Sequence, residues 1–191
     1  MTPSIFEANK HELDQIAHVH KNSYGKNHFT SLLPLKLLAD YYGLFICKES
    51  KILILKEENK ISGFIVFGRN IPEKINHFKK NNKASIFFSA LRNPLSSLKI
   101  LFRKVKNYKK DNFNFSESNF ILLSIASASP GKKIGFLLMK AMIEEASYNK
   151  ESKIGLYVNI NNLNALNLYL GFDFKILNIF SNQFYMELKL N

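Results

Sequence analysis

One stretch of the chain, residues 120–135, joins an apolar run to a basic turn and the start of a helix. It reads FILLSIASASPGKKIG. Its first six residues predict a buried strand, because a short apolar run bounded by turn formers is typical of one. The four small residues at 126–129 let a ligand or another chain lie close to the backbone. The turn that follows carries two glycines and two lysines, and these residue types suit phosphate.

The apolar period changes from 2 to 3.6 after this turn, which indicates an amphipathic helix that begins near Ile134. Its apolar face carries Ile134, Leu137, Leu138, Ala141, Met142 and Ala146. A helix N-terminus offers unpaired N–H groups and the positive end of a dipole to an anion. A turn with a purely structural role is the alternative that the spacing leaves open. The P-loop pattern GxxxxGKS/T and the dinucleotide pattern GxGxxG are both absent.

Strand and helix patterns alternate along the rest of the chain. Strands are predicted at 4–7, 51–57, 61–69, 153–158, 173–180 and 183–190, the second and third forming a hairpin. Helices are predicted at 11–24, which Asn9 can cap, and at 31–48, 75–81, 83–92, 94–109 and after Asn162. The order predicts one mixed α/β domain over residues 1–191, with helices on both faces of its sheet.

Length and composition are those of a globular protein: 191 residues, 46% hydrophobic and 22% charged. No apolar run reaches the ~18 residues of a membrane span, and the first residues do not resemble a signal peptide. We therefore expect a cytoplasmic protein. Its single cysteine, Cys47, is expected to be a packed thiol. No group of His, Cys, Asp and Glu has metal-ligand spacing, so no metal is expected.

The net charge of +12 is concentrated in residues 70–110, which hold nine lysines, two arginines and one glutamate. Because the remainder of the chain carries only +2, a nonspecific nucleic-acid binder is a poor explanation. The alternatives are a helical lid or platform and a surface that contacts anions or an anionic membrane.

Residues 130–135 and 162–172 together resemble two motifs of the GNAT acyltransferases. The first motif, R/Q-x-x-G-x-G/A, opens a helix after a strand, and residues 130–135 match it in part. The second, N-x-x-A-x-x-L-Y…G-F, is matched by Asn162, Ala165, Leu168, Tyr169, Gly171 and Phe172. Pro130 stands in place of Arg or Gln, Lys133 in place of the middle Gly, and two residues are missing before Gly171.

The resemblance implies a GNAT fold: a mixed, mostly antiparallel sheet with a splayed central strand pair. The basic helical residues 70–110 would be an insertion between its third and fourth strands. It also implies transfer of an acetyl group from acetyl-CoA to an amine. The residues expected to bind acetyl-CoA are Ile125, Ala126 and Ser127 at the pantetheine, Gly131, Lys132, Lys133, Ile134, Gly135 and Phe136 at the pyrophosphate, and Asn162 and Asn164.

Tyr169 is the expected general acid, because a phenol is reasonably matched to an alkyl thiol leaving group. Counting back from Gly171 would place Asn167 at this position instead, so the sequence leaves the two open. No general base is evident, although His28 lies in a loop that borders the acceptor side in this family, and Glu117 is a similar candidate.

The chain also resembles GNAT proteins encoded with bacterial surface-polysaccharide genes, which suggests an amino sugar or its nucleotide as acceptor. The competing hypotheses are a catalytically weak CoA-binding module and a basic protein that docks on polyanions or an anionic membrane. A homodimer is compatible with the sequence, and no specific nucleic-acid partner is expected.

Overall fold

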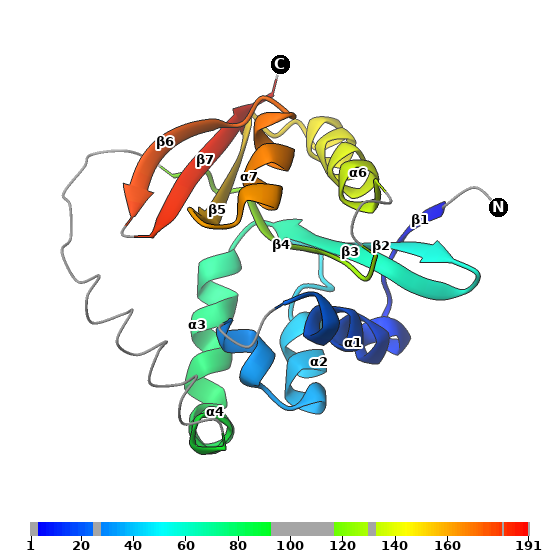
Figure 1. Ribbon diagram of the computed structural model, residues 1–191, viewed down its shortest axis with the longest axis vertical. Coiled ribbons are helices and arrows are strands. Elements are labelled where there is room, and N and C mark those ends of the chain that lie inside the picture. Colours follow the sequence, from blue (N-terminus) through cyan, green and yellow to red (C-terminus); the bar gives the residue numbers. More distant parts are fainter. Residues whose placement is uncertain (1–3, 25–27, 93–116, 130–132, 181, 191) are drawn as a thin grey trace.

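The computed structural model describes residues 4–24, 28–92, 117–129, 133–180 and 182–190. Its centre is a seven-stranded sheet in the order β1-β2-β3-β4-β5-β7-β6 (Figure 1). The strands are β1 (Ser4–Glu7), β2 (Ser50–Glu57), β3 (Lys60–Gly68), β4 (Ile121–Ser127), β5 (Lys153–Asn159), β6 (Lys175–Phe180) and β7 (Gln183–Lys189). All neighbours are antiparallel except β4 and β5. The predicted mixed, mostly antiparallel α/β sheet is confirmed.

The hairpin of β2 and β3 closes on a two-residue turn. Glu58 and Asn59 both have positive φ, 49° and 65°, which is the backbone of a type I′ turn. Such turns match the right-handed twist of the strands that they join. The expected hairpin is therefore present, with the polar turn where the sequence predicted it.

Two apolar cores lie on opposite faces of the sheet. Side chains alternate along β2 and β3, so that Ile54 and Phe64 join one core while Leu55 and Ile65 join the other. The first core is covered by α1 (Leu13–Ser23) and α2 (Leu35–Gly43). The second is covered by α6 (Ile134–Tyr148) and includes Tyr169 of α7 (Leu163–Leu170). Figure 1 shows α6 above the central strands and α1 and α2 below them.

The cap before α1 agrees with the prediction, whereas the bounds of α2 differ from it. Asn9 and Glu12 form a capping box before α1, so the predicted cap is confirmed. The helix expected at 31–48 is wrong in its bounds, because α2 spans only Leu35–Gly43 and a separate 3₁₀ turn occupies Phe29–Leu32. Leu33 is extended, with ψ 142°, since a residue before proline is disfavoured in the helical region.

Two helices, α3 (Ile71–Asn81) and α4 (Lys83–Leu91), follow β3 in the region of highest positive charge. The helix expected at 94–109 lies outside the described residues, and whether 70–110 is an insertion stays a prediction. Among the described residues, no helix is long and apolar enough to cross a membrane.

Cys47 is exposed rather than packed, so that expectation was wrong. It precedes β2, and the thiol lies 3.0 Å from Lys74 Nζ and 3.2 Å from Ser50 Oγ. Burial raises the pKa of this thiol, but the hydrogen bonds from Lys74 and Ser50 outweigh it, so the pKa is lowered. Sequence reasoning could not foresee this environment, because Lys74 belongs to α3, a different element.

Gly63 sets how closely α6 lies on the sheet. A Cβ at this position would stand 2.4 Å from Ile134 Cγ2 and 2.9 Å from the Ala126 carbonyl oxygen. Ile134 is the first residue of α6, and Ala126 lies near the end of β4. The absence of a side chain at 63 therefore fixes the start of α6 against the end of β4.

We predict that Gly63→Ala lowers the free energy of unfolding by about 1–3 kcal/mol, because the added methyl group overpacks the contact with Ile134 and the β4 backbone. Gly43→Ala is the matched control, since its Cβ would meet only the tip of Leu13 at 3.3 Å. Urea titration of both variants measures the difference. Equal stability of the two variants would contradict this account of the packing.

Candidate functional site

The centre of the sheet opens where β4 and β5 separate. Within the described residues, these parallel strands pair only at Ile121–Gly155 and Leu122–Leu156. The register of β4 against β3 shifts at the next position, so that Leu123 is an extra residue in β4. Such a bulge bends a strand and increases its twist. Beyond it β4 leaves β5, and a wedge opens between the two strands, so the expected splay is confirmed.

Backbone groups of β4 line this wedge. Ala128 donates its N–H to the Ser62 carbonyl at 2.8 Å. Because alternate residues of an antiparallel strand bond to the same neighbour, Ala126 also faces β3, and Ile125 and Ser127 face the wedge. Of the three residues expected at the pantetheine, the structure thus directs the backbone of Ile125 and Ser127 to the wedge and that of Ala126 to β3.

The end of α1 reaches the same edge of β4. The Tyr24 hydroxyl donates to the Ile125 carbonyl at 3.1 Å. The Ser23 hydroxyl lies 3.0 Å from the Ser127 carbonyl and 2.7 Å from the Val19 carbonyl. Each carbonyl has a second lone pair, so these contacts leave acceptor capacity for a ligand amide. Sequence reasoning did not foresee that α1 would supply groups to this site.

The basic turn leads into α6 through a strained residue. Lys133, at the N-cap of α6, has φ 57° and ψ 10°, a left-handed conformation that costs a side-chain-bearing residue roughly 1–2 kcal/mol. This geometry explains why a glycine would suit the position. The first turn of α6 has N–H groups without intrahelical partners. Gly131 and Lys132, the other expected residues of the turn, lie outside the described residues.

Gly135 and Phe136 extend the site toward α7. A Cβ at Gly135 would meet Leu168 at 3.3 Å and Ile125 at 3.9 Å, so the first turn of α6 lies between β4 and α7. Phe136 is half exposed, and its ring lies 4.9 Å from that of Phe172. Side chains placed at 135 would disturb this packing as well as any bound anion.

The helix α7 presents one tyrosine inward. Asn162 caps it by accepting the Ala165 N–H at 3.3 Å. Asn164 is exposed. Tyr169 is 6% exposed, whereas Asn167 is exposed. The structure therefore turns Tyr169 toward the interior and Asn167 toward solvent.

Two phenols interact across this region. Burial raises the pKa of Tyr169 above its usual value, and the charge that Tyr24 would acquire raises it further. Burial also raises the pKa of Tyr24, while hydrogen bonds with Ser124 and Ile125 partly offset the effect. The wedge thus has Tyr24 on the α1 side and Tyr169 on the α7 side, both protonated at neutral pH.

Tyr24 and Ser124 were missed by the sequence reasoning. Ser124 is the one polar side chain within the apolar run at 120–125, and this was the available signal. Tyr24 follows His20 by four residues, which places both on one face of a helix, but nothing in the sequence shows that this face meets β4.

The two candidate bases lie at different places: His28 is exposed beside the end of α1, and Glu117 is exposed before β4.

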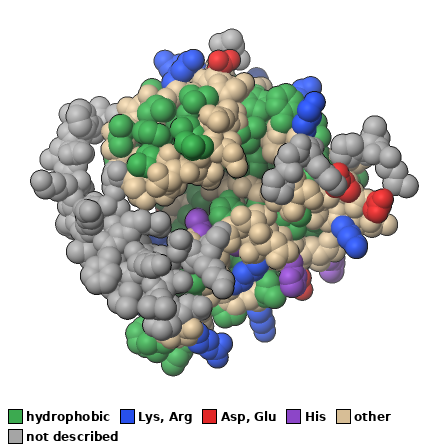
Figure 2. Space-filling view, in the orientation of Figure 1, with side chains coloured by type: hydrophobic (Ala, Val, Ile, Leu, Met, Phe, Trp, Pro, Cys, Tyr) green, Lys and Arg blue, Asp and Glu red, His purple; other side chains and the backbone are tan. Residues whose placement is uncertain are grey.

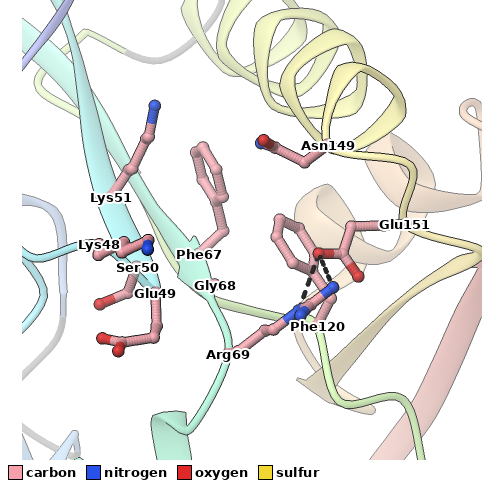
Figure 3. Close-up of a pocket in the computed structure, with 10 residues that line it drawn as sticks. All are labelled: Lys48, Glu49, Ser50, Lys51, Phe67, Gly68, Arg69, Phe120, Asn149 and Glu151. Atoms are coloured by element: carbon pink, nitrogen blue, oxygen red, sulfur yellow. Dashed lines mark hydrogen bonds and ion pairs between the residues drawn. The ribbon is translucent and has the colours of Figure 1, made fainter.

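A second hollow, of about 350 Å³, lies at the opposite end of β4 (Figure 3). It is lined by Lys48, Glu49, Ser50, Lys51, Phe67, Gly68, Arg69, Phe120, Asn149 and Glu151. Arg69 donates to Glu151 at 2.8 and 2.9 Å, and Lys51 lies 2.7 Å from Glu145. Because carboxylates hold these two cations, the hollow is a weaker anion site than the wedge.

Figure 2 shows a hollow on the face of the molecule between the half with α7 and β7 and the half with α1 and α2, and a histidine side chain is visible in it.

Among the described residues, no three His, Cys, Asp or Glu side chains converge as metal ligands would. The groups that α1, β4 and the start of α6 bring together are hydroxyls and backbone amides. These groups suit an uncharged amide chain and a phosphate.

Neither a family model nor a curated protein matches the sequence. Solved structures do match over the whole fold. An N-acetyltransferase from Staphylococcus aureus superposes with a TM-score of 0.64 at 15% identity, covering 100% of both chains. The PaiA N-acetyltransferase from Thermoplasma acidophilum, in complex with coenzyme A, gives 0.60 at 14% identity with the same coverage.

YncA from Salmonella typhimurium, with acetyl-CoA, gives a TM-score of 0.58 at 14% identity, covering 100% of this chain and 95% of that one. At such identities the likeness concerns the fold. The chain therefore has the fold of the GNAT N-acetyltransferases.

Proposed function

We propose that this protein transfers an acetyl group from acetyl-CoA to a primary amine. The observation that carries the proposal is the wedge between β4 and β5 with the N-terminus of α6 at its end. The backbone edge at Ile125 and Ser127 suits an extended amide chain, as in the addition of a strand. The start of α6 beside it suits a pyrophosphate. A molecule with both parts, such as coenzyme A, fits this pairing.

The reaction needs three things of the protein: a neutral amine, donors for the developing oxyanion and a proton for the leaving thiolate. Acetyl-CoA supplies the activated acyl group when it is bound. In this proposal, N–H groups on the wedge side of β4 polarise the thioester carbonyl. Tyr169 is the proton donor, because its buried hydroxyl keeps its proton at neutral pH.

The acceptor is proposed as a small primary amine, with an amino sugar or its nucleotide as the narrower hypothesis. This narrower part rests on the sequence resemblance alone. The basic helices α3 and α4 follow β3, and exposed lysines at 79, 80 and 83 belong to them. Their charge suits an acceptor that carries phosphate, and the contact with an anionic membrane remains the rival proposal.

We predict that acetyl-CoA binds the protein and raises its Tm, because a ligand selective for the folded state stabilises it. Lys133→Ala removes an ammonium beside the start of α6 and should weaken binding about tenfold, the scale of one charge-assisted hydrogen bond. Lys133→Gly should weaken binding equally while relieving the strain of the left-handed backbone. Its Tm without ligand should therefore exceed that of Lys133→Ala.

Lys150 provides the matched control, because it is exposed, has φ 56° and lies just beyond the C-terminal end of α6. Lys150→Ala should leave acetyl-CoA affinity unchanged in titration calorimetry. Equal affinities of wild type, Lys133→Ala and Lys150→Ala would rule out the Lys133 ammonium as a phosphate ligand. Absence of binding to the wild type would overturn the proposed donor.

We predict that Tyr169→Phe lowers kcat by about 10²–10⁴-fold with little change in acetyl-CoA affinity, because the change removes the proton donor and keeps the ring. Thiol release with a panel of amines, including an amino sugar and its nucleotide, measures kcat. Tyr148→Phe is the control, since Tyr148 is 84% exposed at the end of α6. If Asn167→Ala loses activity and Tyr169→Phe keeps it, the assignment of the proton donor to Tyr169 is wrong.

A further inference from the structure

The helix α4 carries an apolar stripe on the side that faces away from the rest of the protein. Phe87, Phe88 and Leu91 are 59%, 61% and 58% exposed. With the exposed Ala84 they follow the i, i+3, i+4, i+7 spacing of one helical face. Single exposed apolar side chains are common on protein surfaces, whereas a group of them on one face marks a site that contacts a partner or a membrane.

The opposite face of α4 is anchored in the protein. Ile86 packs against the core beneath α1 and α2, and Ser89 is buried, with its hydroxyl donating to the Ser85 carbonyl at 2.6 Å. The preceding helix α3 is fixed in the same core by Phe78, whose ring centroid lies 5.2 Å from that of Tyr41 on α2. Because these contacts hold the inner face, the apolar stripe stays on the outside.

Basic side chains border the stripe. Lys83 is the first residue of α4 and Arg92 follows its last residue, and the helical repeat places one on each side of the stripe. Lys80, in the last turn of α3, is also exposed. The chain has no acidic residue from 74 to 110. The stripe therefore has a rim of positive charge, and α4 itself carries no negative side chain.

The position of α4 makes the stripe accessible to a flat surface. Figure 1 shows this helix at the end of the molecule opposite α6, beyond the end of α3. Figure 2 shows hydrophobic side chains at the surface of that end, with Lys or Arg side chains beside them. A surface that contacts the protein there lies away from α6.

The apolar stripe decides between the ligands that the positive charge of this region suits. A phosphate on a small acceptor pairs with cations but gains nothing from exposed phenyl rings. A second copy of the chain, meeting α4 with its own α4, would bring like charges together. An anionic bilayer suits both features, because its headgroups attract Lys and Arg while the boundary of its acyl chains accepts apolar side chains.

We propose that α4 docks the protein on an anionic phospholipid bilayer, with Phe87, Phe88 and Leu91 inserted at the boundary between headgroups and acyl chains. Lys83 and Arg92 then lie at the level of the lipid phosphates, with their stems along the apolar surface. Because binding strength scales with the apolar area buried, so short a stripe gives weak and reversible binding. This docking goes beyond the proposed acetyl transfer and does not depend on it.

A fluorescent reporter tests the insertion directly. The chain contains no tryptophan, so Phe88→Trp places a single indole on the stripe. Its emission should shift to shorter wavelength when vesicles of phosphatidylglycerol and phosphatidylcholine in equal amounts are added, because the indole leaves water. Vesicles of phosphatidylcholine alone should cause no such shift, and added salt should reduce it, since salt screens the charges.

Tyr148→Trp is the matched control for the reporter, since Tyr148 is 84% exposed at the end of α6, away from α4. Its emission should not change with either kind of vesicle. An equal shift in both reporters would contradict docking through α4, because it would show that the protein meets the bilayer without a preferred face.

Co-sedimentation with the same vesicles measures the affinity. Phe87→Ser combined with Phe88→Ser should weaken binding at least about tenfold, because two rings no longer enter the bilayer. Lys83→Gln combined with Arg92→Gln should weaken it roughly 25-fold, about fivefold for each basic residue near an anionic surface. The variants without the two rings should keep the Tm of the wild type, since both rings are exposed.

Ile179→Ser and Lys150→Gln are the controls for these changes, because both side chains are exposed and lie on other elements. Both variants should bind the vesicles as the wild type does. Wild-type binding to neither kind of vesicle, or to both equally, would overturn the docking and leave acetyl transfer intact. Failure of the wild type to release thiol with any amine would overturn the proposed function and leave the docking intact.

Two further outcomes would assign α4 to another ligand and overturn the docking. One is a dimer in analytical ultracentrifugation that the loss of Phe87 and Phe88 converts to a monomer, which would assign the stripe to a second copy. The other is unchanged vesicle binding in Lys83→Gln with Arg92→Gln, together with a raised KM for an amine that carries phosphate. That result would assign the charges to the acceptor.

Discussion

The structure depends on the extra residue that β4 carries at Leu123. Because this bulge follows directly on the two paired positions of β4 and β5, the parallel pairing, which is the only one among the described residues, covers just these two positions. Backbone N–H and C=O groups along the diverging edge then need other partners, since unpaired buried groups are costly. Hydroxyls from α1 supply some of them, and an extended ligand can supply others. The binding edge is thus a consequence of an interrupted sheet.

The wedge stays open because each of its walls is held from outside. β4 is anchored to β3 in antiparallel register, and β5 to β7 along its whole length. The core beneath α1 and α2 supports the first wall, while the core beneath α6 extends under both. The missing side chain at Gly63 lets α6 settle at the end of β4. An anion at the start of α6 would therefore lie at a fixed position relative to the β4 edge.

Local patterns in the sequence predicted the features that depend on interactions between neighbouring residues. The hairpin turn at Glu58 and Asn59, the Asn9 cap, the strand β4 and the start of α6 were all readable, because each depends on neighbouring residues. The start of α2 was misjudged although Pro34 gave the signal, since the apolar pattern was followed through it. The exposure of Cys47 was not readable, because it depends on how distant elements meet.

The same distinction between local and long-range contacts applies to the residues of the candidate site. The residues of β4 and α6 were expected because strand, turn and helix are contiguous in sequence. The choice between Tyr169 and Asn167 was left open by counting, and the burial of α7 separates the two side chains. Tyr24 and Ser124 are 100 residues apart, so only the folded chain shows that they touch.

Burial acts on the two tyrosines in the same direction, although their neighbours differ. Tyr169 packs beside Phe174, at 5.9 Å between ring centroids, in an apolar core that disfavours its anion and raises its pKa. Burial also raises the pKa of Tyr24, and the hydrogen bonds with Ser124 and the Ile125 carbonyl offset part of this effect. Both phenols therefore keep their protons at neutral pH. Because a protonated hydroxyl can donate a hydrogen bond, the burial of α7 suits Tyr169 to the proton-donor role proposed for it.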